Sequence, residues 1–241
     1  MGEDPTHGVE ASAVDLGSSR RRRPASASPA PRPTPGPAPE QTVAPSDTPA
    51  AFDTVAVAAS AGGLTALIRL LSGLPEDFPA SVVVVQHLDP RHRSLIAEIL
   101  SRRTPLHVRL AENNDVLAPA TVHIAPPNRH LLVNPDRSVS LSESEMVHFL
   151  RPSADLLFES VAAAYKERAI GVVLTGTGSD GAMGVQAIKK MGGTVIAQDE
   201  ETSDFFGMPS AAIRTGCVDF TLPLDEIPSA LVTLVMKGAV A

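Results

Sequence analysis

Short apolar runs alternate with amphipathic stretches from about residue 51 onward. The apolar runs are rich in β-branched and small residues, as expected of strands that are buried on both faces. They cover residues 54–59, 81–88, 169–174 and 194–198. The stretches with helical spacing cover residues 64–71, 94–103, 154–167, 182–190, 209–214 and 224–235. Buried strands that alternate with helices predict an α/β fold: a doubly wound, mostly parallel sheet with helices on both faces.

A different pattern interrupts this alternation between residues 106 and 142. Short alternating pieces, separated by Pro and Asn, lie at residues 108–110, 121–125, 130–133 and 138–141. Such pieces are typical of paired strands, and they predict a small antiparallel hairpin insertion. After it, Ser153 is the expected N-cap of helix 154–167, with Asp155 in the first turn of that helix.

The composition changes sharply near residue 50. The first 50 residues hold ten of the 22 prolines and no aromatic residue. Such a segment cannot bury enough apolar surface to offset the entropy of ordering. We therefore expect a disordered Pro/Ala-rich tail over residues 1–50 and one catalytic domain over residues 51–241. The basic run at residues 20–23 is expected to be solvated, with a docking or nucleic-acid patch as the alternative.

Composition also limits the classes of function. The 241 residues carry 27 acidic and 20 basic side chains, a net charge of −7, which argues against a nucleic-acid-binding protein. The single Cys, Cys217, excludes an internal disulfide framework and a Cys-based zinc site, and is expected to be a small core residue. No pair of histidines has a convincing metal spacing, so neither a metal nor another cofactor is expected. The sequence has no apolar run of membrane-spanning length and no secretory signal, which predicts a cytoplasmic protein.

Three predicted strands end in side chains that suit acyl transfer. Ser60 follows the first strand in a turn of small residues, with a helix N-terminus beyond it that offers free N–H groups to an oxyanion. His87 closes the second strand and is placed to act as a general base toward Ser60. Asp180 lies in a glycine-rich loop after the strand at 169–174, where it is placed to orient His87. In parallel sheets the ligand crevice lies beyond the carboxyl ends of the strands, so these residues are expected to meet there.

Each of these residues also has a plain structural interpretation. Ser60 would be a small residue in a tight turn, His87 a hydrogen-bonded structural histidine, and Asp180 a helix cap. A dinucleotide-binding loop fails the G-x-G-x-x-G pattern, because Ala58 and Ser60 occupy the first two Gly positions. The chain order Ser–His–Asp differs from that of α/β-hydrolases, but a triad is defined by its geometry and roles.

Several motifs together resemble one known family. In chain order they are VAVAASAGGL, VVVVQHLDP, IAPPNRHLLV, RPSADLLFESVA, VVLTGTGSDGAMG and AQDEETSDFFGMPSAAI. They resemble successive signatures of the catalytic domain of the chemotaxis receptor methylesterase, CheB, from about residue 54 to residue 235. The resemblance implies a triad of Ser60 as nucleophile, His87 as base and Asp180 as third member. It also implies hydrolysis of glutamyl methyl esters on cytoplasmic helices of chemoreceptors, and deamidation of receptor glutamines.

Typical members of that family carry a phosphoacceptor receiver domain before the catalytic domain. The 50 preceding residues have a composition that cannot fold in that way, so we expect a stand-alone form that is either constitutively open or controlled by a regulator that acts in trans. The loops at residues 126–130 and 205–209 are expected to contact the receptor helix; for the second loop the alternative is that it folds back onto the core. A catalytically weak scaffold module of a signalling array, and an esterase for another substrate, remain alternatives.

Overall fold

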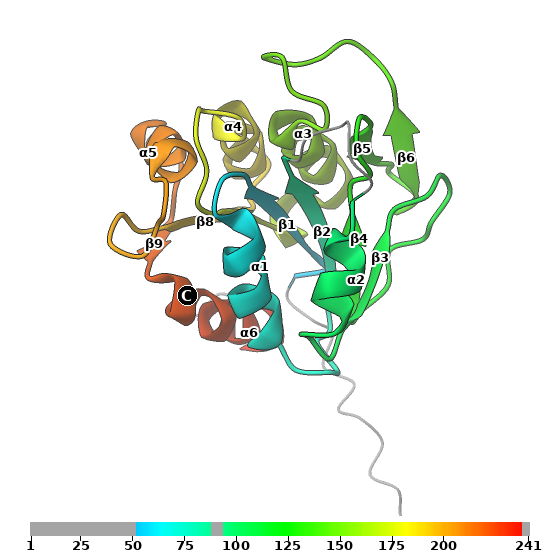
Figure 1. Cartoon of the computed structure of the whole chain (residues 1–241), viewed down its shortest axis with the longest axis horizontal. Helices are drawn as coiled ribbons and strands as arrows, with labels where there is room; N and C mark the ends of the chain where they lie inside the picture. Colours follow the sequence, from blue (N-terminus) through cyan, green and yellow to red (C-terminus); the bar gives the residue numbers. More distant parts are fainter. Residues whose placement is uncertain (1–51, 88–93, 238–241) are drawn as a thin grey trace, which may run out of the picture. The chain divides into compact units, whose positions relative to one another are not determined.

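A parallel sheet forms the centre of the computed structural model, which describes residues 52–87 and 94–237 (Figure 1). Its seven strands have the order β3-β4-β2-β1-β7-β8-β9, and every pair is parallel. The strands are β1 (Thr54–Ala59), β2 (Ser81–Gln86), β3 (His107–Leu110), β4 (Thr121–Ile124), β7 (Ala169–Val173), β8 (Thr194–Gln198) and β9 (Phe220–Leu222). The predicted α/β fold class is confirmed. The expected tail, residues 1–50, lies outside the described residues.

Helices cover both faces of this sheet. The first face carries α1 (Gly63–Ser72), α2 (Ile96–Ser101) and α6 (Ile227–Lys237), and the opposite face carries α3 (Ala154–Tyr165), α4 (Ala182–Lys190) and α5 (Gly207–Arg214). Short 3-10 turns, η1 (Lys166–Arg168) and η2 (Leu224–Glu226), precede β7 and α6. Within residues 52–87 and 94–237, none of the helices combines the length and apolar character needed to cross a bilayer.

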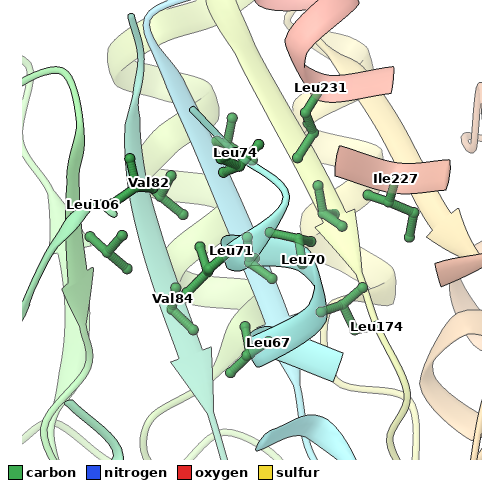
Figure 2. Close-up of a cluster of buried hydrophobic side chains, with 14 of the residues drawn as sticks. Leu67, Leu70, Leu71, Leu74, Val82, Val84, Leu106, Leu174, Ile227 and Leu231 are labelled. Atoms are coloured by element: carbon green, nitrogen blue, oxygen red, sulfur yellow. The ribbon is translucent and has the colours of Figure 1, made fainter. Parts of the chain in front are cut away.

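Two apolar cores hold these layers together. Figure 2 shows part of the first, where Leu67, Leu70 and Leu71 of α1 lie against the sheet and α6 lies beside α1 on the same face. Their side chains are fully buried. Each such burial stabilises the fold by about 1.5–3 kcal/mol. The second core lies on the other face and includes Phe158 and Val161 of α3. All six residues of β1 are buried because helices pack on both of its faces.

The prediction for residues 106–142 was half wrong. Only β5 (His130–Val133) and β6 (Val139–Ser142) form an antiparallel hairpin, as a separate two-stranded sheet. β3 and β4 instead extend the main sheet in parallel. The alternating exposure of β3 reflects its place at the sheet edge, where one face is only partly covered by α2. The short edge strand β9 was not predicted.

The direction of winding reverses at β1. From β1 the sheet continues through β2 and β4 to β3 on one side, and through β7 and β8 to β9 on the other. The chain leaves β1 for α1 on one face and leaves β7 for α4 on the opposite face. In open sheets of this kind, ligands bind beyond the carboxyl ends of the strands where the winding reverses, so the residues that follow β1 and its neighbours are the ones to inspect.

Candidate active site

Ser60 and His87 are neighbours at the carboxyl end of the parallel strands. Ala59 of β1 pairs with Gln86 of β2, so Ser60 and His87 are the next residues of adjacent parallel strands. The N–H of His87 donates to the carbonyl of Ala59 at 3.0 Å, and the N–H of Ser60 donates to the carbonyl of Thr175 at 3.0 Å. These bonds extend the sheet ladder past the strand ends and fix both backbone positions.

Asp180 lies directly against His87. The Nε2 atom of His87 is 2.9 Å from Oδ2 of Asp180, and the two side chains are 10% and 1% exposed. The carboxylate of Asp180 also accepts the Ser153 hydroxyl at 2.9 Å and the N–H groups of Ala154 at 2.6 Å and Asp155 at 3.1 Å. With donors on both oxygens, Asp180 acts as an acceptor, so Nε2 of His87 carries the proton. The lone pair of Nδ1 is then available to accept one.

The surroundings of Asp180 favour its ionised form. Burial alone would raise the pKa of this carboxyl group, but the hydrogen bonds from His87, Ala154 and Asp155 outweigh burial and lower the pKa below its ordinary value. Ala154 and Asp155 begin α3, so their N–H groups also bring the positive end of the helix dipole to the carboxylate. A negative charge is thereby held beside the imidazole.

The loops before α3 and α4 exchange caps. Asp180 precedes α4 but accepts N–H groups of α3, whereas Asp155 of α3 accepts the N–H groups of Met183 at 2.9 Å and Gly184 at 2.8 Å in α4. Burial, and to a lesser degree repulsion from Asp180, raises the pKa of Asp155. Ser153 does not cap α3 through its side chain, contrary to the sequence-based expectation, because its hydroxyl donates to Asp180 instead.

A buried histidine contacts Ser153, which in turn donates a hydrogen bond to Asp180. His130, at the start of β5, is fully buried, and its Nδ1 accepts the N–H of Ser153 at 3.1 Å. Its Nε2 lies 3.1 Å from the carbonyl of Glu145 and must be the donor there. Burial lowers the pKa of His130, so the ring is held neutral. The sequence analysis did not predict the contacts that His130, Ser153 and Asp155 make around Asp180.

We expect His130 to make the fold less stable in mild acid. Its pKa in the folded state is lowered from the ordinary value of 6.5, so below that pH the unfolded chain takes up a proton that the folded chain does not. The free energy of unfolding should therefore fall as the pH drops below about 6.5. Urea titrations between pH 7.5 and 5 measure this slope, and His130→Gln should make it less steep; His123, whose pKa burial also lowers, contributes to the slope that is left. An equal slope in the variant would contradict the assignment.

The turn after Ser60 exposes backbone donors. Gly62 has a φ of +77°, and a Cβ added there would lie 2.6 Å from Oδ2 of Asp204, so both conformation and space favour glycine. Within the residues that the structure describes, the N–H groups of Ala61 and Gly62 have no hydrogen-bond partner. They lie at the N-terminus of α1, where unpaired N–H groups suit a developing negative charge.

The loop at 205–209 packs against the same turn. Thr175 accepts the N–H of Phe205 at 2.9 Å through its hydroxyl oxygen, and that hydroxyl lies 3.1 Å from the carbonyl of Ala61. Phe205 is 48% exposed, whereas Met208 is buried in the second core. The loop is therefore divided: one apolar side chain faces solvent and another folds back.

A hollow of about 120 Å³ opens beside His87. It is lined by His87, Asn128, Met146, Phe149, Leu150, Arg151 and Pro152. Asn128 belongs to the loop at 126–130, which the sequence predicted to contact a partner. Arg151 links two segments of the rim through hydrogen bonds. It donates to the side-chain oxygen of Asn128 and to the carbonyls of Glu143 and Ser144. Phe149 at this rim is 94% exposed.

Other reactive groups lie apart from this edge. Cys217 is a half-buried free thiol that packs at the margin of the second core. Among the residues that the structure describes, no group of three or more His, Cys, Asp or Glu side chains is placed to hold a metal ion.

Fold and site together define an α/β protein with Ser, His and Asp on one sheet edge. The model of the family described as CheB methylesterase matches residues 55–231. The chain belongs to the CheB methylesterase family. It is 37% identical to the crystal structure of the Thermotoga maritima CheB methylesterase catalytic domain, with a TM-score of 0.74, covering 76% of this chain and 99% of that one.

Curated relatives carry consistent names. A protein-glutamate methylesterase/protein-glutamine glutaminase 2 of Anaeromyxobacter dehalogenans is 46% identical over 179 residues, which cover 74% of this chain and 52% of the relative. One of Pyrococcus horikoshii is 40% identical, over 75% of this chain and 50% of the relative. This chain thus spans about half the length of these relatives. A putative protein of the same name in Leptospira interrogans is 37% identical, over 76% of this chain and 95% of the relative.

Proposed function

We propose that this protein is a protein-glutamate methylesterase with Ser60 as nucleophile, His87 as general base and Asp180 as the carboxylate that orients the base. The observation that carries the proposal is the 2.9 Å contact between His87 Nε2 and the carboxylate of Asp180. His87 follows the strand that pairs with the strand before Ser60. Family membership over residues 55–231 supports the same reaction, and we propose that it is carried out by one catalytic domain over residues 51–241.

In the acylation step, Ser60 Oγ attacks the carbonyl carbon of a glutamyl methyl ester. His87 accepts the hydroxyl proton, most directly at Nδ1, because the Nε2 proton is held by Asp180. The same proton then passes to the departing methoxide, which leaves as methanol, and Ser60 remains esterified to the glutamyl group. The negative charge of Asp180 stabilises the transient imidazolium.

In the deacylation step, water attacks the acyl-enzyme while His87 takes up one of its protons. Collapse of the second tetrahedral intermediate returns a proton to Ser60 Oγ and releases the glutamate side chain as a carboxylic acid, which loses its proton to solvent. In both steps the oxyanion is stabilised by the unpaired N–H groups near Ala61 and Gly62. An amide substrate would follow the same path with ammonia as leaving group, which supports the deamidation of glutamine that the relatives' names state.

The proposed substrate is a methylated cytoplasmic helix of a chemoreceptor, which places the protein in the cytoplasm. Two exposed aromatic side chains near the candidate site support a protein-sized substrate: Phe149 at the rim of the hollow beside His87, and Phe205 on the loop packed against the Ser60 turn. Exposed apolar side chains around a site commonly mark contacts with a partner.

Methanol release tests this proposal. The purified full chain is incubated with cytoplasmic receptor fragments that were methylated beforehand, and with unmethylated fragments as control. We expect methanol to appear only with the methylated fragments, in an amount equal to the methyl groups lost. A folded protein that releases no methanol from a fragment shown to be methylated would contradict the proposal and favour a scaffold role or another ester.

A further inference from the structure

One buried side chain joins the backbones of Ser60 and His87. Gln86, the last residue of β2, is 4% exposed. Its amide nitrogen donates to the carbonyl of Ser60 at 2.7 Å and to the carbonyl of His87 at 3.0 Å. Both amide hydrogens are therefore used. The orientation of the amide follows from its partners, because two carbonyl oxygens require donors and the flipped amide would offer them an acceptor.

This contact also determines the direction of a backbone donor. The carbonyl of Ser60 accepts a second hydrogen bond, from the N–H of Gly63 at 2.9 Å, so it is held from two sides. A peptide group is planar and almost always trans, so its C=O and N–H point in opposite directions. Fixing the Ser60 carbonyl toward Gln86 therefore turns the N–H of Ala61 away from Gln86, and that N–H is one of the unpaired donors at the turn.

The side chain of Gln86 also destabilises the fold in one respect. Its Oε1 is buried and has no hydrogen-bond partner within the residues that the structure describes. A buried acceptor without a partner destabilises a fold. In addition, a Cβ added to Gly63 would lie 2.1 Å from Oε1, so the start of α1 needs glycine to leave room for this amide. An apolar side chain of similar size would avoid the unpaired acceptor, but it would leave the two carbonyls unclamped.

We infer that Gln86 is a positioning residue for the esterase reaction. By clamping the carbonyls of Ser60 and His87, it aligns the oxyanion donor of Ala61 and fixes the spacing of nucleophile and base. The inference rests on the proposed function, and it assigns Gln86 no contact with substrate. Loss of the clamp should lower the rate of the chemical step and leave the binding of the receptor fragment nearly unchanged, because no docking surface is altered.

Kinetics of Gln86→Met in the full chain test this inference. Met has a similar volume and no donor. We expect kcat for methanol release to fall about 10- to 100-fold, since small misplacements and lost oxyanion donors have effects of this size, while KM stays within about twofold. The matched control is Ser81→Ala at the opposite end of β2. Ser81 is also buried, and its hydroxyl donates a hydrogen bond to the hydroxyl oxygen of Thr54 at 2.9 Å. This variant should lower the melting temperature but keep kcat.

A second readout is independent of the receptor. The rate at which a small fluorophosphonate labels Ser60 reports the reactivity of the nucleophile and the oxyanion donors, and it should fall in Gln86→Met but not in Ser81→Ala. Unchanged kcat or unchanged labelling in Gln86→Met would overturn the inference, as would an equal loss in Ser81→Ala. If the wild type labels normally yet releases no methanol, the proposed substrate is wrong, and the labelling rates still decide the role of Gln86.

Discussion

Ser60→Ala should lower methanol release from methylated receptor fragments by about 10⁴-fold or more in kcat. The variant removes only the hydroxyl that is the proposed nucleophile. Ala is tolerated by the turn because Ser60 is held by its backbone: its N–H donates to Thr175, and its carbonyl accepts from Gly63 and Gln86. The variant should therefore melt close to the wild-type temperature and still bind the fragment.

The control for this variant is Ser179→Ala. Ser179 is exposed and lies one residue before Asp180 in the glycine-rich loop, so the variant removes a hydroxyl from the same edge of the sheet. We expect its kcat to match that of the wild type. Measurable release by Ser60→Ala within tenfold of wild type would contradict Ser60 as the nucleophile. Equal loss in both variants would point to damage at the sheet edge and not to lost chemistry.

The arrangement of strand ends was predictable because it follows from periodicity. Uninterrupted apolar runs indicate strands that are buried on both faces, which favours a parallel sheet. Parallel strands bring their carboxyl ends to the same end of the sheet. Ser60, His87 and Asp180 each follow such a run, so the sequence alone places them near one another. The structure puts Ser60 and His87 in adjacent register and Asp180 in contact with His87.

The supporting contacts were not predictable, because they depend on packing between distant segments. The exchange of caps between Asp155 and Asp180 exists only because the N-termini of α3 and α4 lie side by side. A sequence pattern gives each helix its nearest polar residue as cap, which is why Ser153 was assigned to α3. The parallel pairing of β3 and β4 was missed for a similar reason. Alternating apolar and polar residues indicate that one face of a strand is partly exposed, and the edge strand β3 has such a face whether its neighbour runs parallel or antiparallel.

Asp180→Asn is the second variant with a large expected effect. The carboxylate is replaced by an amide of the same shape, so the charge beside His87 disappears. If the amide turns its NH₂ toward His87, Nε2 becomes an acceptor, and the proton of the neutral ring moves to Nδ1, where the proposed mechanism needs a lone pair. The transient imidazolium also loses its counter-charge. We expect kcat to fall by about 10³- to 10⁴-fold, as such a change does in a serine triad.

The same substitution should also affect stability, and a second cap provides the control. Asp180 accepts three donors besides His87, so an amide in its place should lower the free energy of unfolding by about 2 kcal/mol. Because the folded pKa of Asp180 is lowered, the wild-type contribution is present above about pH 3.8 and is lost in stronger acid, so the difference between the two proteins should shrink there.

Asp155→Asn separates stability from catalysis. Asp155 caps α4 through one oxygen, which an amide retains, and it has no bond to His87. This variant should therefore keep the wild-type kcat when activity is expressed per folded molecule, whatever its melting temperature. If Asp155→Asn and Asp180→Asn lost activity to the same extent, the carboxylates would act by holding α3 and α4 together. A loss confined to Asp180→Asn, with activity expressed per folded molecule, means that the carboxylate next to His87 acts on the reaction.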